Sequence, residues 1–271
     1  MSIGHSTALE IELHRRRELA VELAQSAGGI TLAHFRRSGL QIELKADQSP
    51  VTIADREAEL ALRAGIKERF PQDAILGEEF GEESGTSGFR WILDPIDGTK
   101  SFIRGVPLYG TLIGVEHEAR SVVGVIHIPP TGEMLHAVAG DAAFYQDGAQ
   151  PAVKARVSPT AKLGESLFCT SDPVTFRQVD RAAHLERLIA ACQLCRTWGD
   201  CYGYLLVATG RADLMVDPLL SVWDAAALQP ILEAAGGSFT DWQGRPTIYT
   251  GDAIATNSRL LAEVLQITAT R

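Results

Sequence analysis

The sequence predicts a layered α/β fold, and two features of this chain of 271 residues indicate it. Segments in which apolar residues recur with a helical period alternate with short apolar runs of the length of buried strands. An element with one apolar face must bury that face against another element, so a mixed set of helices and strands packs in layers. Residues 157–160 mark a join between two halves. We therefore expect a single domain over residues 1–271, with subdomains at about 1–157 and 158–271.

The first half predicts helices and short strands in turn. Residues 9–37 show a helical pattern, and Gly28-Gly29 within it favours a kink. Residues 55–69 indicate a second, amphipathic helix. Short strands are predicted at residues 41–45, 74–76 and 91–93, with a Gly/Ser loop at 82–88. Alternating apolar and polar residues predict a meander over 108–116, 121–127, 133–138 and 143–145.

The second half continues the same alternation. Helices are predicted at residues 176–191, 202–209 and 224–235, and strands at 212–216 and 238–240. Gly236-Gly237 is expected to end the last helix, because glycine readily adopts the backbone conformation that follows a helix.

Charge and composition restrict the classes of function that this chain can have. The chain carries 25 basic and 34 acidic residues, a formal net charge of −9, which argues against binding nucleic acid or anionic membranes. A phosphate substrate stays compatible, because a bound cation can invert the local field. No apolar run reaches the roughly 18 residues of a membrane span, and residues 1–17 lack the apolar segment of a secretory signal. We therefore expect a cytoplasmic protein.

Residues 91–111 are the most informative segment. A buried strand at 91–93 is followed by Asp94 and Asp97, and then at once by Gly98 and Thr99. Carboxylates at the end of a strand can converge on a hard cation. A helix that starts at Gly98-Thr99 would offer free N–H groups to an anion beside that cation. An Asp-x-x-Asp-Gly run is also common in turns, so this segment alone leaves both interpretations open.

Three further segments supply acids. Glu78 and Glu79 follow a predicted strand, and one of them can point into the same site as Asp94. Asp55 and Asp224 each stand at the head of a predicted helix, where an aspartate is more often a plain cap than a ligand.

These segments, in this order, resemble the inositol monophosphatase family of magnesium-dependent phosphatases. The resemblance spans about residues 10–265, and four motifs carry it: Pro50-Val51-Thr52 leading to Asp55, Gly77-Glu78-Glu79, Asp94-Pro95-Ile96-Asp97-Gly98-Thr99, and Trp223-Asp224 followed by Ala235-Gly236-Gly237. It implies an α-β-α-β-α sandwich, two to three magnesium ions as cofactors, a small phosphate ester as substrate, and a homodimer.

The resemblance also implies roles for individual residues. Glu78, Asp94 and the carbonyl of Ile96 would hold one magnesium ion. Asp94, Asp97 and Asp224 would hold a second ion, and a third, weaker ion would depend on Glu78. Thr99, oriented by Asp55, would position or deprotonate the attacking water, so Asp55, Thr99 and Glu78 are the expected catalytic residues. Asp97, Gly98 and Thr99 would bind the phosphate group.

Residues 196–204 resemble the histidinol-phosphate phosphatase branch of the family, as does Lys100-Ser101-Phe102-Ile103. The inositol enzymes usually have a small neutral residue where this chain has Asp200. A carboxylate there suits a cationic substrate, and the substrate half is expected to use Arg196, Asp200 and Asp217. The alternatives are that Asp200 pairs with Arg196 or caps a helix, and that Asp217 is a turn residue ahead of Pro218.

Other functions stay open at this point. Inositol phosphate, a sugar bisphosphate and a 3′-phosphoadenosine nucleotide are alternative substrates, and a non-catalytic metal-dependent binding protein is a remote alternative. Cys192 and Cys195 form a Cys-x-x-Cys with Cys201 nearby, but the spacing does not complete a zinc site. We expect reduced, mostly buried thiols.

Overall fold

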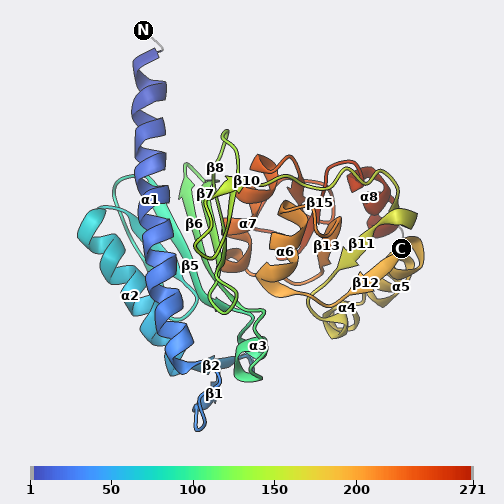
Figure 1. The fold of residues 1–271 in the computed structure, drawn as a ribbon, viewed down its shortest axis with the longest axis horizontal. Helices are drawn as coiled ribbons and strands as arrows, with labels where there is room; N and C mark the ends of the chain where they lie inside the picture. Colours follow the sequence, from blue (N-terminus) through green and yellow to red (C-terminus); the bar gives the residue numbers. More distant parts are fainter. Residues whose placement is uncertain (1–2, 270–271) are drawn as a thin grey trace.

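The computed structural model describes residues 3–269 as five layers in the order α-β-α-β-α (Figure 1). The first layer consists of α1 (Ile3–His34) and α2 (Ile53–Arg69). The middle layer consists of α6 (Asp200–Ala208) and α7 (Val222–Ala234), between two sheets. The last layer consists of α4 (Pro173–Gln178), α5 (Ala182–Ala191) and α8 (Leu261–Ala269). The layered α/β class and the five-layer sandwich are thereby confirmed.

The larger sheet has eight strands in the order β10-β9-β8-β7-β6-β5-β3-β4. The strands are β3 (Ala74–Gly77), β4 (Gly81–Glu83), β5 (Phe89–Asp97), β6 (Gly110–His117), β7 (Arg120–Ile128), β8 (Glu133–Val138), β9 (Phe144–Asp147) and β10 (Val153–Lys154). Strand β5 alternates its side chains between two cores: Trp91 and Leu93 pack with α1 and α2, whereas Ile92 packs with α6 and α7. An added Cβ at Gly124 would lie 2.1 Å from the Ala227 carbonyl oxygen, so this glycine allows α7 to lie directly on the sheet.

The smaller sheet has five strands in the order β12-β11-β13-β15-β14. They are β11 (Leu167–Cys169), β12 (Leu194–Arg196), β13 (Leu214–Asp217), β14 (Ser238–Thr240) and β15 (Ala253–Thr256). The hairpin β1 (Ile42–Leu44) and β2 (Pro50–Thr52), the short helix α3 (Thr99–Ile103) and a 3₁₀ turn (Leu163–Glu165) complete the fold.

Several sequence expectations need correction. The single helix expected at residues 176–191 is wrong: α4 and α5 are separate, and Asp180 between them has φ 58°, in the left-handed region that interrupts a helix. The loop expected at 82–88 begins inside strand β4. Strands β2, β10, β11, β12 and β15 and helix α8 were not predicted, because they are brief and carry weak periodic signals.

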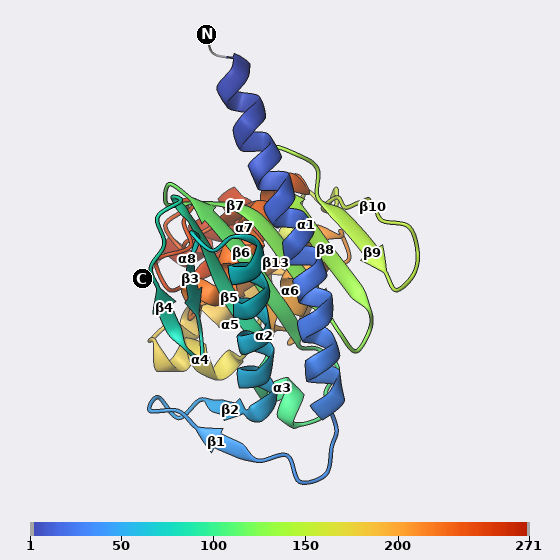
Figure 2. The same ribbon diagram turned by 90° about the vertical axis from the view of Figure 1, so that its left-hand side faces the viewer.

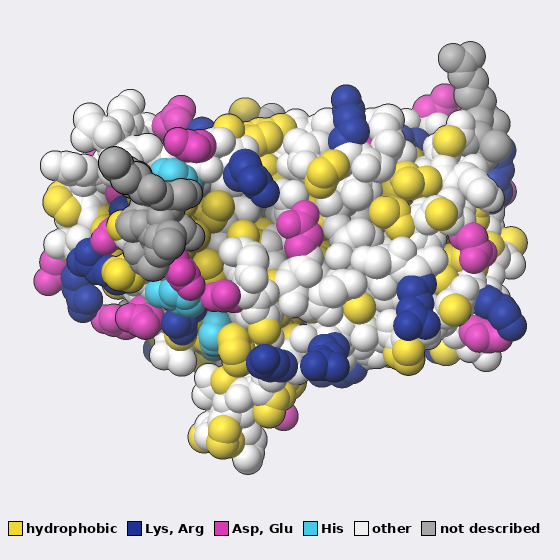
Figure 3. Space-filling view, turned by 90° about the horizontal axis from the view of Figure 1, so that it is seen from above, with side chains coloured by type: hydrophobic (Ala, Val, Ile, Leu, Met, Phe, Trp, Pro, Cys, Tyr) yellow, Lys and Arg dark blue, Asp and Glu magenta, His cyan; other side chains and the backbone are white. Residues whose placement is uncertain are grey.

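The two ends of the sandwich differ. Figure 2 shows α1 and α2 lying across the large sheet, with the β1–β2 hairpin and α3 together at one end and the first turns of α1 extending past the other. On that other end, acidic, basic and apolar side chains are intermixed (Figure 3). Within residues 3–269, every helix is too short or too polar to cross a membrane.

Candidate active site

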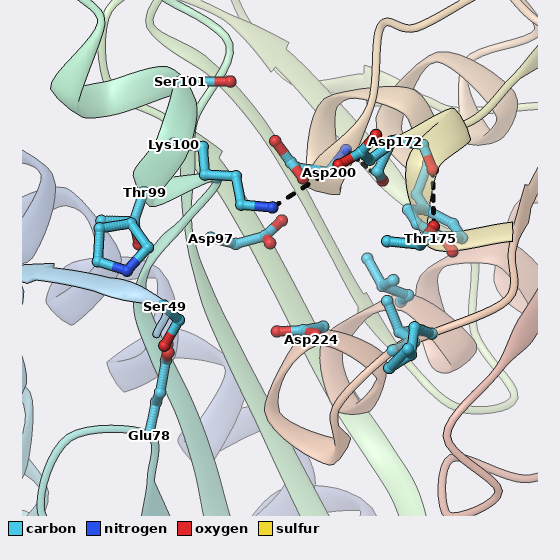
Figure 4. A pocket seen from close by; sticks show the side chains of 17 residues that line it. Ser49, Glu78, Asp97, Thr99, Lys100, Ser101, Asp172, Thr175, Asp200 and Asp224 are labelled. Atoms are coloured by element: carbon cyan, nitrogen blue, oxygen red, sulfur yellow. Dashed lines mark hydrogen bonds and ion pairs between the residues drawn. The ribbon is translucent and has the colours of Figure 1, made fainter. Parts of the chain in front are cut away.

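A cavity of about 320 Å³ opens at the α3 end of the sandwich, between the two sheets (Figure 4). The β1–β2 hairpin, β5, α3, α4, α6 and α7 all contribute side chains to it. Its lining is rich in carboxylates: Glu78, Asp97, Asp172, Asp200 and Asp224.

An irregularity in strand β5 brings Asp94 and Asp97 together. Side chains alternate along a strand, so two residues three apart ought to face opposite sides of the sheet. Here Asp94 pairs with Leu112 and Asp97 with Gly110, so β5 holds one residue more than β6 between these two pairs. This β-bulge lies between Asp94 and Asp97, where the missing N–H of Pro95 is tolerated, and it returns both aspartates to one side.

Asp224 joins them from α7. One carboxylate oxygen each of Asp94, Asp97 and Asp224 lies within 4.8 Å of the others. Asp224 is the third residue of α7, and its Oδ2 accepts a hydrogen bond of 2.8 Å from the backbone N–H of Ser221. The Asp224 side chain can therefore cap the start of α7 and also serve as a metal ligand.

Burial and mutual repulsion disfavour the charged forms of these carboxylates. Burial, together with the neighbouring carboxylates, raises the pKa of Asp94 and of Asp97 well above the usual range. Burial raises the pKa of Asp224 to about 7. A divalent cation would relieve this repulsion, and three converging carboxylates are the oxygen donors that magnesium prefers. The residues present therefore fit the metal that the family resemblance implies.

Glu78 lines the same cavity from a different direction. The turn after β3 is clamped by Glu59, a buried side chain of α2 that accepts hydrogen bonds from the backbone N–H groups of Glu79 (2.8 Å) and Phe80 (3.2 Å). The Glu78 carboxylate itself accepts a 2.6 Å hydrogen bond from Lys45 Nζ. The contact of Lys45 with Glu78 was not predicted from the sequence, because a single lysine in a polar hairpin belongs to no recognisable motif.

Thr99 and Asp55 lie in contact. Thr99 Oγ1 is 3.4 Å from Asp55 Oδ1 and 3.0 Å from the carbonyl oxygen of Ile96. The other oxygen of Asp55 accepts from both the backbone N–H and the hydroxyl of Thr52, which forms a capping box at the start of α2. Asp55 is therefore a cap that also holds the Thr99 hydroxyl in the cavity.

Asp200 stands beside the start of α3. Gly98, which precedes α3, has φ 88°, and an added Cβ there would lie 2.9 Å from Asp200 Oδ2. The backbone N–H of Asp200 donates to Ser171 Oγ at 2.9 Å. Burial raises the pKa of Asp200 to about 6, while the charge of Lys100 and a hydrogen bond from Ser101 oppose this rise. Asp200 thus faces the cavity next to the expected phosphate position.

The two other expected substrate residues do not line the cavity. Asp217 is buried behind it, where its carboxylate accepts hydrogen bonds from Thr170, from Ser171 and from the hydroxyl of Tyr204 (2.9 Å). Arg196 is exposed on β12, and its guanidinium lies 5.9 Å from the Trp198 ring centroid and donates to the Cys195 carbonyl. Asp200 therefore does not pair with Arg196. Asp217 is a buried hydrogen-bond acceptor at the end of β13 and not a turn residue.

Two charged residues of the lining were not expected to act there. Asp172 caps α4 by accepting from the backbone N–H of Val174 at 2.8 Å, and its Oδ2 lies 3.7 Å from Lys100 Nζ. Asp172-Pro173 is a helix-start signal that could have located the cap, but no local pattern indicates that α4 faces the cavity.

Comparison with known proteins places the chain in a family. The family model described as "Inositol monophosphatase family" matches residues 12–270. The chain belongs to the inositol monophosphatase family. The order of its motifs along the sequence is therefore that of a family member, as the resemblance implied.

Members of this family with curated names are similar over nearly the full length. The chain is 43% identical over 248 residues to a histidinol-phosphatase of Chlorobaculum parvum, covering 92% of this chain and 94% of that protein. It is 38% identical to a histidinol-phosphatase of Mycobacterium tuberculosis, covering 91% and 95%. Among solved structures, an inositol monophosphatase from Zymomonas mobilis superposes with a TM-score of 0.83 at 35% identity, covering 95% and 98%.

Proposed function

We propose that this chain is a magnesium-dependent phosphate monoester hydrolase whose substrate is histidinol phosphate, and that it uses two or three magnesium ions. One observation carries the proposal: a single cavity is lined by Asp97 and Asp224, which form a cluster with the buried Asp94, and also by the further carboxylate of Asp200 beside Gly98. The names of the similar histidinol-phosphatases support the same substrate.

Different groups in the cavity are expected to have different roles in hydrolysis. When bound, magnesium would neutralise the phosphoryl oxygens and lower the pKa of a water molecule. Thr99 Oγ1 donates its proton toward Asp55 or the Ile96 carbonyl, so its lone pairs are free to accept a hydrogen bond from the attacking water. Asp55 Oδ1 is then the acceptor for a proton passed through Thr99. Phosphoryl transfer depends on such positioning and on charge stabilisation, and no covalent nucleophile is required.

The alcohol side of the substrate is expected to lie at Asp200. Histidinol carries an ammonium group and an imidazole, whereas inositol is uncharged. A carboxylate partly withdrawn from water contributes more to binding an ammonium group than an exposed one, because solvent screens it less. Asp217 acts from behind this wall by holding Ser171 and Tyr204 in place.

Two further aspects complete the proposal. The family resemblance supports a homodimer, which sedimentation of the purified protein would test. All four cysteines are free thiols, and this supports a reducing compartment such as the cytoplasm.

A phosphate-release assay tests the activity and its specificity together. With magnesium present, histidinol phosphate should be hydrolysed with a higher kcat/KM than inositol phosphate, fructose bisphosphate or adenosine bisphosphate. Asp200→Asn should then lower kcat/KM for histidinol phosphate about ten- to a hundredfold, the value of a charge-assisted contact, and change that for inositol phosphate far less.

A matched control removes an equal charge elsewhere. Asp147→Asn replaces an exposed carboxylate on β9, outside the cavity, and should leave both rates unchanged. Equal losses on both esters in Asp200→Asn would mean that Asp200 shapes the α6 start and does not select the substrate. The absence of magnesium-dependent phosphate release from every ester would refute the enzymatic proposal.

A further inference from the structure

Lys100 is placed in the cavity with its ammonium group turned toward acids of the opposite wall. It lies in α3, next in sequence to Thr99, on the side where the phosphate is expected. Its Nζ is 3.7 Å from Asp172 Oδ2 on α4, and its charge acts on Asp200 of α6 (Figure 4). The Lys100 side chain therefore reaches from the phosphate side to the alcohol side of the cavity.

The charges of the lining explain why a cation stands there. Among the described residues that line the cavity, Lys100 is the single basic side chain, against five carboxylates. Bound magnesium would balance the carboxylates at the metal end. Asp172 and Asp200 lie on the other wall, and Lys100 is the lining residue that balances them in the free protein.

The contact of Lys100 with this wall is weak enough to be replaced. The side chain of Lys100 is 75% exposed and that of Asp172 is 36% exposed. An ion pair so open to solvent contributes little, because water screens it and because ordering a long side chain costs entropy. A substrate cation that enters the partly buried space beside Asp200 can therefore displace the lysine at small cost.

We propose that Lys100 is a tethered counter-ion that occupies the position of the substrate's ammonium group in the free enzyme and is displaced when a cationic phosphate ester binds. This inference rests on the proposed function. It makes Lys100 a specificity-determining residue. A neutral alcohol leaves the lysine seated, whereas a cationic alcohol gains the attraction of both Asp172 and Asp200 but must first release the lysine from them.

The competing role for Lys100 is direct binding of the phosphate. Its position next to Thr99 permits this, and the two roles predict opposite results. A phosphate ligand helps every ester equally, so its removal raises KM for all of them. A displaceable counter-ion competes only with a cationic substrate, so its removal lowers KM for that substrate alone.

The experiment compares Lys100→Met with the unchanged protein on histidinol phosphate and inositol phosphate, with magnesium present. For histidinol phosphate, KM should fall about two- to fivefold, the scale of a weak exposed ion pair, while kcat stays the same. For inositol phosphate, KM should not fall. Calorimetry gives a second readout without turnover: histidinol should bind Lys100→Met more tightly than the unchanged protein.

Two control variants separate position from charge. Lys162→Met removes a lysine that is likewise 75% exposed and paired with an acid, Glu165 at 3.2 Å, but lies outside the cavity, and it should leave both KM values unchanged. Lys100→Arg keeps the charge and should preserve the ratio of the two specificity constants.

The outcomes distinguish this inference from the proposed function. A rise of KM for both esters in Lys100→Met assigns the lysine to the phosphate and overturns the inference. An unchanged ratio, in an enzyme that prefers histidinol phosphate, overturns the inference alone. An unchanged protein that hydrolyses inositol phosphate but not histidinol phosphate refutes the proposed substrate, and the inference with it.

Discussion

Asp94 is the residue on which the proposed chemistry depends most. It is buried, it lies in the cluster with Asp97 and Asp224, and its Oδ1 accepts a 3.0 Å hydrogen bond from the backbone N–H of Ile96. An asparagine can keep that hydrogen bond through its amide oxygen, but it cannot supply a negative charge to two cations. The substitution thus separates the electrostatic role of Asp94 from its structural role.

We predict that Asp94→Asn lowers kcat/KM by roughly a hundredfold or more. Mutating a hydrogen-bond partner of a metal ligand already costs up to about a hundredfold, and Asp94 is expected to bind the metal directly. The measurement is magnesium-dependent phosphate release, together with circular dichroism to verify folding. Near-normal activity in a well-folded Asp94→Asn protein would rule out the metal assignment.

Thr99 permits a sharper test, because its hydroxyl is expected to act mainly in the transition state. Thr99→Ala should lower kcat by more than it raises KM, since orienting the water contributes little to substrate binding. Thr99→Ser retains a hydroxyl that can reach Asp55 and should recover most of the rate. A large rise of KM with unchanged kcat would instead assign Thr99 to substrate binding.

At the scale of elements, the turn between β3 and β4 shows how a helix positions a site residue. Gly77 lies against Glu59 of α2 so closely that an added Cβ would be 2.0 Å from Glu59 Oε1. Glu59 cannot move aside freely, because Arg63 Nε holds it at 2.8 Å and the backbone N–H groups of the turn hold it as well. The position of Glu78 in the cavity therefore depends on a glycine and a buried helical glutamate.

Gly77→Ala should accordingly destabilise the protein by about 1–3 kcal/mol, the cost of overpacking a well-filled interior, and should lower activity by displacing Glu78. The control is Gly29→Ala in α1, where an added Cβ meets no atom within 4 Å. That variant should gain about 0.5–1 kcal/mol, because alanine is the better helix residue. Urea unfolding of both variants measures the difference, and equal stabilities would contradict the proposed clamp.

The elements also show what local sequence can and cannot predict. The Asp94-x-x-Asp97-Gly98-Thr99 motif is local, so its place at the end of a strand could be predicted. The bulge that turns Asp94 and Asp97 to one side could not, because it depends on pairing with β6. Asp172 and Lys45 escaped prediction for a related reason: tertiary packing alone brings their elements to the cavity.

At the scale of the whole molecule, resemblance predicted more than periodicity did. Alternating patterns indicate layers but do not order them, because short strands such as β11 and β12 pair across long stretches of chain. The five-layer order followed from the family motifs and is confirmed. The division into subdomains at about 1–157 and 158–271 stays a prediction, although each of the two larger sheets falls within one of these halves.

The acidic cluster also links metal binding to the stability of the whole protein. The pKa of Asp224 is raised to about 7 in the folded, metal-free chain, against about 3.8 for an ordinary aspartate. A raised folded pKa gives a stabilising contribution that is complete below the unfolded pKa and is lost as the pH rises through the folded value. In EDTA, this group should therefore reduce stability between about pH 4 and pH 7.

Magnesium should reverse that loss, because it binds the ionised carboxylates of the folded state and not the unfolded chain. At a hundred times its dissociation constant it should add about 2.7 kcal/mol, which raises Tm by roughly 5–10 °C for a chain of this size. The gain should grow from pH 5 to pH 8, because proton competition for the cluster falls, and Asp94→Asn should abolish most of it. Thermal unfolding in EDTA and in magnesium across this range measures it. An equal magnesium gain in the unchanged protein and in Asp94→Asn would place the stabilising ion elsewhere and leave the acidic cluster without its proposed cation.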